Sequence, residues 1–305
     1  MSIRHKSRVL TATAVALVLV ATSAISASAA PSANENVASF INRVAPDQGT
    51  VVRGQSTGTA TRMSTGNTTV SIPSNPASPI RIAGPSGGGL EVTLPGNLGL
   101  QPGQTASDGT IVYQSAGDNV DAAVQTMHDG SVRMQTIINN PSAAREFSYG
   151  IGAGFQPVKA TDGSIWVAGF SKSGEYQAFG VGNAWARDAN GKAVPTHYEI
   201  RGHDLVQIVT PNAGAAYPIV ADPSWIWYSG AWGAGFSKAE TRSLASIGAI
   251  TGFCAALPGA FAIACAIFGA DWFLQASLAA NARGCVFIAV VPAPIAMRWI
   301  SSSCR

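Results

Sequence analysis

The sequence has few of the residues on which enzymes most often rely. Charged residues make up only 11% of its 305 positions, and it contains four histidines. It has no G-x-S-x-G, P-loop, dinucleotide-binding glycine pattern or HExxH, and the glycine-rich stretch at 84–89 lacks the lysine and helix of a phosphate site. These absences exclude the best-known hydrolase, nucleotide-binding and zinc-protease motifs. We therefore expect no enzyme, no catalytic residue, and no metal or small-molecule cofactor.

Two histidines lie close enough in the chain to be considered as a pair. His197 and His203 are six residues apart, with Glu199 between them and Asp204 beside them. On a single strand they would share a face, as an acid–base or metal-binding pair does. A strand flanked by surface histidines is far more common, so we assign these residues no function. The remaining histidine of the mature chain, His128, belongs to an expected hairpin turn.

Cysteine is absent from the first 253 residues, and four cysteines follow. An even number in an exported chain indicates disulfides, and four cysteines allow three pairings. We favour Cys254–Cys265 and Cys285–Cys304, because the helices and strands expected around them bring these pairs together. Zinc is the alternative. It is disfavoured because the cysteines are separated by ten, nineteen and eighteen residues, without the close pairs of metal sites, and no histidine follows His203.

The N-terminus has the pattern of a secretory signal, which is removed on export. Basic residues at 4–8 are followed by an uncharged run at 9–25 and then by small residues. We place cleavage after Ala29, because cleavage one residue later would leave Pro31 beside the scissile bond. An uncleaved anchor is the alternative, but about 17 uncharged residues are few for a bilayer core of about 30 Å. The mature protein is therefore expected outside the cell.

Removal of the signal changes the charge balance. The chain has 19 basic and 16 acidic residues, and the mature part retains 16 of each. A nucleic-acid partner requires a basic surface, so we expect none. The charge is unevenly distributed, with a net charge of −3 for residues 31–222 and of +3 for residues 223–305. The two parts therefore differ in the sign of their net charge. The sequence leaves the oligomeric state open.

The 33 glycines and 17 prolines indicate a chain rich in turns. Residues 30–108 are expected to form a Gly/Pro/Ser-rich N-terminal region with a helix at Asn36–Val44 and a strand at Leu90–Leu94. Residues 109–222 alternate β-branched or aromatic runs with turn residues, which predicts an antiparallel β domain. The expected strands are 110–114, 122–127, 131–138, 164–170, 175–181, 184–189, 196–202, 205–210 and 217–222. Tight turns are expected at His128-Asp129-Gly130, Asp162-Gly163, Ser173-Gly174 and Asn190-Gly191.

Residues 237–305 are expected to form a cysteine-containing C-terminal domain, after an aromatic and glycine-rich linker at 223–236. Ser237 and Glu240 have the spacing of a capping box, and the helix that they begin is expected to end at Ala256.

A second helix is expected from Ala260 to Ala282, closed by Arg283-Gly284. Strands at 285–291 and 295–300 complete the domain. The turn between the two helices brings Cys254 and Cys265 together, and the β-hairpin brings Cys285 and Cys304 together. The expected fold class is α+β: an antiparallel β-sandwich or open barrel, followed by a small disulfide-stapled helical hairpin plus β-hairpin.

The uncharged segment Ser243–Ala270 allows two interpretations. Its helices either pack their apolar faces on the β-hairpin or the larger domain, or lie on or insert into an anionic membrane. A Pro-Gly turn at 258–259 divides the segment into pieces too short to cross a bilayer alone. The basic residues that would attract anionic lipid are Lys238, Arg242, Arg283, Arg298 and Arg305.

The linker is rich in tryptophan. Trp225 and Trp227 would share one face of a strand, and Trp232 follows. Such a cluster either contacts a membrane or partner, or holds two domains together by burying apolar area. The glycines of the linker also allow a proteolytic cleavage that would release the C-terminal domain.

From about Asp108 to Trp225, ending in AWARDANGKAVPTHYEIRGHDLVQIV and then YPIVADPSW, the chain resembles a β-rich module of exported actinobacterial proteins. Several of those proteins carry a short cysteine-containing domain after an Ala-Asp-Pro-x-Trp boundary, and FSKAETRSLA is similar to part of one such tail. The resemblance covers about two thirds of the chain. It implies no assigned activity for the module and a bacteriocin-like or toxin-like effector for the tail. It identifies no functional residue.

These patterns predict a secreted, non-enzymatic protein whose C-terminal domain is a bacteriocin-like, membrane-active effector carried by the β domain. The hairpin Leu244–Ala280 would insert into, or lie on, the target-cell membrane. The alternative is an extracellular or cell-envelope binding or structural protein with no membrane activity. In that case Trp225, Trp227 and Trp232 would face a ligand or partner.

Overall fold

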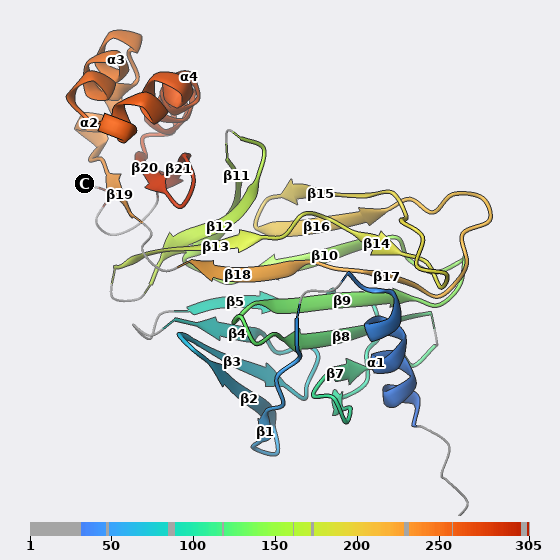
Figure 1. Ribbon diagram of the computed structural model, residues 1–305. Coiled ribbons are helices and arrows are strands. Elements are labelled where there is room, and N and C mark those ends of the chain that lie inside the picture. The colour runs from blue at the N-terminus through green and yellow to red at the C-terminus, as the bar shows by residue number, and fades with distance from the viewer. Residues whose placement is uncertain are drawn as a thin grey trace, which may run out of the picture. The chain divides into compact units, whose positions relative to one another are not determined.

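Two antiparallel sheets face each other in the larger part of the chain, and a smaller sheet with helices follows them (Figure 1). The computed structural model describes residues 32–46, 49–84, 89–117, 119–160, 162–171, 174–228, 232–257, 259–299 and 304. The predicted signal peptide and its cleavage site after Ala29 lie outside these residues, as does Arg305. The predicted α+β class is confirmed.

The sandwich consists of two sheets in which every strand pair is antiparallel. In spatial order the first sheet contains β1 (Gln55–Ser56), β2 (Ala60–Thr65), β3 (Thr68–Pro73), β4 (Ile80–Ala83), β5 (Gly89–Thr93), β10 (Glu146–Ile151), β16 (Asp204–Val209) and β15 (Thr196–Arg201). The second contains β11 (Phe155–Lys159), β12 (Ile165–Phe170), β13 (Tyr176–Val181), β18 (Ser224–Tyr228), β9 (Val132–Ile138), β8 (Val120–Thr126), β7 (Ile111–Tyr113) and β6 (Gln104–Thr105). β17 (Ile219–Ala221) pairs with β9 and with β14 (Ala186–Arg187).

The main core lies between these sheets and is built from alternate residues of their strands. In β4, Ile80 and Ile82 are buried while Arg81 between them is exposed, the period expected for a strand covered on one face. Across the core, the rings of Tyr149 on β10 and Trp225 on β18 meet edge to face, with centroids 6.4 Å apart. Contacts of this kind from both sheets make the domain a sandwich.

Helix α1 (Ala33–Val44) covers the outer face of the second sheet. Phe40, Ile41 and Val44 pack on β8, β9 and β17. As a result every residue of β8 and β9 is buried, since the main core covers their other face. The sequence predicted most of this helix, but not that the β domain depends on it for covering its second sheet.

Residues 30–108 contain more strands than the one that the sequence predicted at Leu90–Leu94. They contribute α1 and the strands β1–β6, and β5 pairs with β10 inside the first sheet. Strands β2 and β3 bury only Thr61, Met63, Thr68, Val70 and Ile72, and most of the residues between them are threonine, serine or arginine. A strand with so few large apolar residues resembles a polar loop in sequence, and the neighbouring strands are what stabilise it.

Strands β10 and β11 also lie outside the segments predicted as strands. The sequence SYGIGAGF that joins them resembles a turn because it is rich in glycine. Gly150 has a different role in the sheet. It lies opposite Thr93, whose Oγ1 would be 2.6 Å from a Cβ added at Gly150. The missing side chain therefore lets two strands pair closely.

The C-terminal module, residues 232–304, is built on a three-stranded antiparallel sheet: β19 (Trp232–Gly235), β20 (Cys285–Val291) and β21 (Ile295–Trp299). One face is covered by α2 (Lys238–Leu244), α3 (Ile247–Ala256) and α4 (Gly259–Asn281) (Figure 1). Side chains of β20 alternate between two cores. Val286 and Ile288 pack under the helices, whereas Phe287 and Ala289 pack on the sandwich. The predicted β-hairpin is confirmed.

Aromatic side chains join the module to strands β11–β13. The ring of Phe287 lies 4.9 Å from that of Phe170 and 4.5 Å from that of Tyr176, measured between centroids. Gln156 Nε2 donates a hydrogen bond to the carbonyl of Arg298 at 3.2 Å. The contacts seen between the two parts are therefore made by side chains of β20 and of β11–β13, and by the main chain of β21.

Two predicted boundaries differ from the structure. Most of the predicted linker at 223–236 is strand, because β18 pairs with β13 and β9 in the sandwich while β19 pairs with β20 in the module. The first predicted helix is divided in two at Ala245-Ser246, where the Ser246 hydroxyl accepts a hydrogen bond from the Ala249 N–H and caps α3.

The end of α4 also differs from the prediction in one residue. Arg283, with φ 53°, takes the left-handed conformation that the sequence assigned to Gly284. The N–H groups of Arg283 and Gly284 donate to the carbonyls of Ala280 and Ala279. These bonds close the helix in the manner of a C-cap, so the prediction was right about the segment and wrong about the residue.

Candidate functional site

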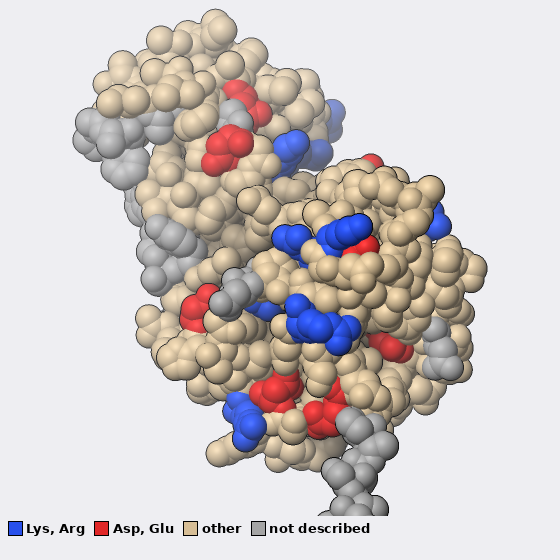
Figure 2. Space-filling view, turned by 45° about the vertical axis from the view of Figure 1, so that its right-hand side comes forward, with Lys and Arg blue, Asp and Glu red and all other residues tan. Residues whose placement is uncertain are grey.

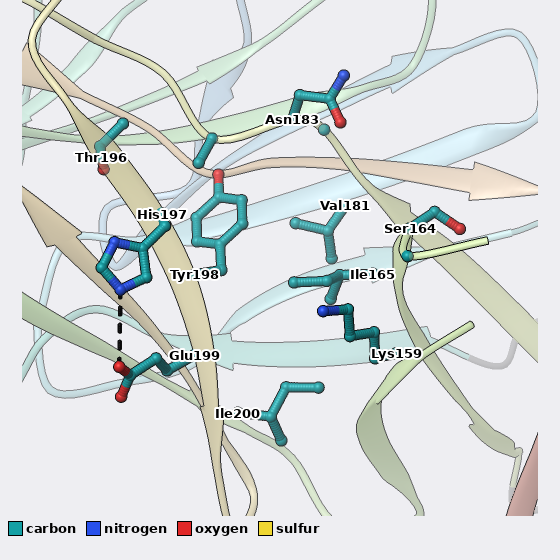
Figure 3. Close-up of a pocket in the computed structure, with 13 residues that line it drawn as sticks. Lys159, Ser164, Ile165, Val181, Asn183, Thr196, His197, Tyr198, Glu199 and Ile200 are labelled. Carbon is teal, nitrogen blue, oxygen red and sulfur yellow. Dashed lines mark ion pairs between the residues drawn. The ribbon is translucent and has the colours of Figure 1, made fainter. Parts of the chain in front are cut away.

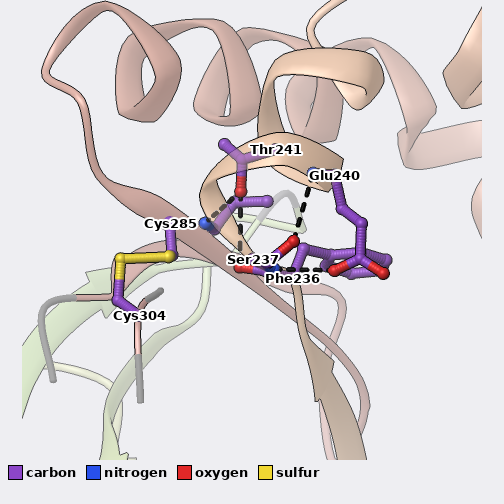
Figure 4. The surroundings of a disulfide bond; sticks show 7 residues. Phe236, Ser237, Glu240, Thr241, Cys285 and Cys304 are labelled. Carbon is purple, nitrogen blue, oxygen red and sulfur yellow. Dashed lines mark hydrogen bonds between the residues drawn. A yellow bond between two sulfur atoms is a disulfide. The ribbon is translucent and has the colours of Figure 1, made fainter. Parts of the chain in front are cut away.

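The C-terminal module carries most of the predicted functional residues. Hydrogen bonds at the start of its first helix, α2, fix that helix in place (Figure 4). The Glu240 N–H donates to Ser237 Oγ at 3.3 Å, and the Ser237 N–H donates to the Glu240 carboxylate at 2.8 Å, which confirms the capping box. The buried Thr241 hydroxyl donates to the Phe236 carbonyl at 3.4 Å and accepts from the Val286 N–H at 3.0 Å. These bonds attach α2 to β20.

Both predicted disulfides are present. Cys254–Cys265 joins α3 to α4, and Cys285–Cys304 joins the start of β20 to the end of the chain (Figure 4). Their Cα–Cα distances of 5.1 and 5.6 Å are ordinary for disulfides. The predicted pairing is therefore confirmed, for the reason given from the sequence: each bridge connects neighbouring elements.

Helix α4 is apolar around most of its circumference, but only one side of it is buried. That side contains the fully buried Cys265, Trp272, Ala276 and Ala279. The opposite side contains Ile263, Ile267, Leu274 and Leu278, whose exposed fractions are 65, 65, 51 and 47%. Separations of three, four and seven residues place each group along one side of a helix. The outer side of α4 is thus an apolar stripe open to solvent.

Exposed apolar side chains concentrate on these helices. Of the seven large apolar side chains that are exposed in the described part of the chain, four form the stripe on α4 and a fifth, Ile247, lies on α3 at 69% exposure. We call these five residues the apolar helical face. Exposed apolar side chains that gather on one part of a protein are typical of surfaces that meet a membrane or another protein. No helix in the described ranges has the length and apolar character that crossing a membrane requires.

Four of the predicted basic contacts are exposed, three of them at the ends of helices. Lys238 begins α2, Arg242 lies in its last turn, Arg283 follows α4, and all three are exposed. Arg298, on β21, is also exposed. Figure 2 shows a broad surface without charged side chains over the helical part at the top of the view. In the same view both acidic and basic side chains lie below this uncharged surface.

The three tryptophans do not form one exposed cluster. Trp225 is 0% exposed, because its side chain points into the core between the two sheets, so its predicted contact with a membrane or partner is wrong. Trp227 shares its face of β18, as predicted, and is partly buried against the same core. The side chain of Trp232 lies outside what the structure describes, and its contact stays a prediction.

A groove lies where β15 approaches the ends of β11, β12 and β13 (Figure 3). Its volume is about 740 Å³. The residues that line it are Lys159, Gly163–Ile165, Val181–Ala184 and Thr196–Ile200. In the view of Figure 3, the apolar side chains of Ile165 and Val181 and the Tyr198 ring lie between the polar groups of His197 and Ser164. The groove thus has an apolar floor and polar sides.

The histidine pair considered from the sequence does not form. β15 ends at Arg201, and Gly202-His203 makes the turn to β16, so His197 and His203 lie on different elements. His197 Nε2 is 3.6 Å from Glu199 Oε1, and the Arg201 guanidinium is 2.7 Å from Glu199 Oε2. The hydrogen bond from Arg201 is the main cause that lowers the pKa of the Glu199 carboxyl. Glu199 is therefore held as a carboxylate.

One buried carboxyl group was not among the predicted functional residues. Asp222 is 0% exposed and accepts hydrogen bonds from the Trp185 N–H at 3.2 Å, the Tyr198 hydroxyl at 3.1 Å and the Ser224 hydroxyl at 3.0 Å. Burial raises the pKa of Asp222 to about 7. The sequence does contain a signal for it, since an aspartate directly after the apolar strand Ile219–Ala221 cannot easily avoid burial.

Comparisons of the chain with protein-family models, with curated proteins and with solved structures found no match. The resemblance to exported actinobacterial proteins therefore remains an expectation from the sequence. The function proposed below rests on the residues of this chain and on their arrangement.

Proposed function

We propose that this is a secreted, non-enzymatic protein that acts on the target-cell membrane through its C-terminal module, as a bacteriocin-like effector. The observation that carries the proposal is the apolar stripe on α4, which faces solvent opposite the buried side of the helix. Export is supported by the signal pattern and by two disulfides, which persist in an oxidising compartment.

Contact with lipid would remove the apolar helical face from water. Transferring the exposed part of each large aliphatic side chain contributes about 1 kcal/mol, so the four residues on α4 contribute about 4 kcal/mol together. A helix with an exposed apolar side can lie in the plane of the membrane interface, with that side among the acyl chains. The helices need not unfold for this, because the Cys254–Cys265 disulfide and the sheet hold them from the other side.

Exposed basic residues of the module would favour anionic lipid. Each lysine or arginine near such a surface contributes about 1 kcal/mol. Arg283 lies about one turn beyond Leu278, the last residue of the stripe, so that a helix lying on the membrane brings its guanidinium toward the headgroups. Lys238 and Arg242 on α2 are also exposed.

In this proposal the β domain is the carrier of the module. It covers the second face of the module's sheet, where Phe287, Ile295 and Met297 are buried. A fragment cut off at the start of the module would expose these side chains to water and could bind vesicles through them. The experiment therefore uses the whole mature chain.

The test measures binding of oxidised residues 30–305 to dye-loaded vesicles, with phosphatidylglycerol-rich and purely phosphatidylcholine vesicles in parallel. We expect co-sedimentation and dye release with the anionic vesicles, both weakening as salt is raised, because exposed charges are screened. Absence of both co-sedimentation and release from anionic vesicles would reject the proposal. Equal binding to the two lipids would reject the role of the basic residues.

Loss of the disulfide between the helices is expected to weaken vesicle binding. The cysteines of this bridge are 11 residues apart, and closing a loop of this size stabilises a fold by about 3 kcal/mol. In the variant Cys254→Ala/Cys265→Ala, α3 is held to α4 by packing alone. We expect a lower thermal midpoint for the module by circular dichroism and weaker co-sedimentation. Cys285→Ala/Cys304→Ala is the matched control, since that bridge touches neither α3 nor α4. Binding that persists unchanged in both variants would show the disulfides to be incidental.

The alternative function, binding to the cell envelope without membrane activity, is favoured by the groove at β15. It remains the second candidate. It differs from the first in the part of the chain that would act, because the groove belongs to the sandwich and the apolar helical face to the module.

A further inference from the structure

The groove follows the edge of β15 rather than one of its faces. Five consecutive residues, Thr196–Ile200, line it. Successive side chains of a strand point to opposite faces of the sheet. Five in a row can line a single groove only when it runs along the strand's edge. β15 is the last strand of the first sheet, and its sole strand neighbour among the described residues is β16.

The register of β15 shows which main-chain groups point into the groove. Arg201 pairs with Asp204 across a two-residue turn, and the Thr210 N–H donates to the Pro195 carbonyl at 2.8 Å. In an antiparallel pair, residues that bond to the partner strand alternate with residues that do not. Positions 195, 197, 199 and 201 therefore bond toward β16. The N–H and C=O groups of Thr196, Tyr198 and Ile200 point toward the open edge.

The opposite wall of the groove supplies an apolar surface and a cation. Ile165 and Val181 come from paired positions of β12 and β13 and are partly buried. Lys159, the last residue of β11, is exposed at the same wall (Figure 3). No ion pair of Lys159 occurs within the described ranges, whereas Glu199 across the groove shares the Arg201 guanidinium with Glu146, at 2.7 Å from each carboxylate. The cation available to a ligand is therefore Lys159.

We propose that this groove binds an extended peptide segment, which adds to the first sheet as a strand beside β15. The main-chain groups of Thr196, Tyr198 and Ile200 would pair with the peptide backbone. One apolar side chain of the peptide would rest on Ile165 and Val181, and a carboxylate of the peptide would meet Lys159. A volume of about 740 Å³ suits a segment of a few residues.

The experiment selects peptides from a displayed library of random heptapeptides with free C-termini, using the whole mature protein as target. Selected peptides are then titrated against four variants. Ile200→Pro removes an outward N–H without removing a bond to β16, as proline does on edge strands, and Ile200→Ala is its matched control. Lys159→Ala removes the cation, and Lys192→Ala, a lysine outside the groove, is its control.

We expect Ile200→Pro and Lys159→Ala each to weaken peptide binding about tenfold, since each removes one hydrogen bond or charge contact. The two controls should bind within about threefold of the parent, since they leave the backbone donor and the groove cation in place. Hydrogen exchange at Tyr198 and Ile200 should slow when the peptide is added.

Three results would overturn the proposal. In the first, the selection enriches no peptide. In the second, the enriched peptides bind Ile200→Pro as tightly as the parent. In the third, light scattering shows a dimer that Ile200→Pro dissociates, which would make the occupant a second copy of this chain. Vesicle binding by Ile200→Pro should equal that of the parent, so the failure of this inference and the failure of the membrane proposal are distinguishable.

Discussion

Replacing Ile263, Ile267, Leu274 and Leu278 together by serine is expected to reduce binding to anionic vesicles by several hundredfold. These side chains are 47–65% exposed, and burying the exposed part of each in lipid is worth about 1 kcal/mol. A total of about 4 kcal/mol corresponds to a factor of several hundred in the partition coefficient. The measurement is co-sedimentation with vesicles over a range of lipid concentrations.

The same variant should retain its fold, because the stripe contributes little to the core of the module. That core consists of residues on the other side of α4, such as Trp272 and Ala276, which are fully buried. Far-ultraviolet circular dichroism and the thermal midpoint report on this directly. The matched control is Ile200→Ser/Ile226→Ser, which removes two exposed isoleucines from the sandwich. Equal loss of binding in the control, or undiminished binding in the fourfold variant, would contradict the membrane proposal.

Replacing Asp222 by asparagine is expected to remove a marked dependence of stability on pH. The pKa of Asp222 rises from 3.8 in the unfolded chain to about 7 in the fold, because the carboxyl is buried. Between these values the folded state holds a proton that the unfolded state has lost. Stability contributed by this group is therefore highest near pH 4, falls as the pH rises, and reaches its minimum above about pH 7. The full difference is on the order of 4 kcal/mol.

Urea unfolding of the mature protein at several pH values between about 4 and 8 measures this difference. In Asp222→Asn the free energy of unfolding should fall less between about pH 4 and pH 8 than in the parent, by a few kcal/mol. Asparagine can still accept hydrogen bonds from Trp185 and Tyr198 through its carbonyl oxygen. The control is Asp162→Asn, at an exposed turn where a hydrogen bond from the Ser164 hydroxyl lowers the pKa of the carboxyl. That group titrates below the window, so Asp162→Asn should keep the parent's profile. An Asp222→Asn profile parallel to the parent's would disprove the raised pKa.

Features that depend on neighbours in the chain could be predicted from the sequence. The capping box at Ser237 and Glu240 needs only a hydroxyl and a carboxylate three residues apart. The disulfides follow from a helical hairpin and a β-hairpin, because each connects adjacent elements. The turn at Asp129-Gly130 is likewise local, since glycine supplies the positive φ of 88° that it requires.

Features that depend on distant segments could not be predicted. Trp225 looks exposed in a stretch of glycines and aromatics, and it is buried because its face of β18 is covered by the other sheet, where Tyr149 contacts it. The segments of β1–β4 look like loops in the sequence, and they are strands because each has a neighbour with which to pair. Neither fact follows from composition, because pairing partners far apart in sequence are chosen by the packing of the whole sandwich.

The sequence by itself determined the α+β class, the helical hairpin, the β-hairpin and both disulfides, since all of these rest on short-range spacing. It also determined that the segment Ser243–Ala270, which forms α3 and the first half of α4, carries no charge. Only the tertiary structure decided which side of α4 is buried against the sheet and which is left to solvent. Only it placed Lys159 across a groove from β15 and buried Asp222 beside Tyr198. The reason is physical: burial is a property of the assembled sheets and helices, and no single segment of the chain specifies what covers it.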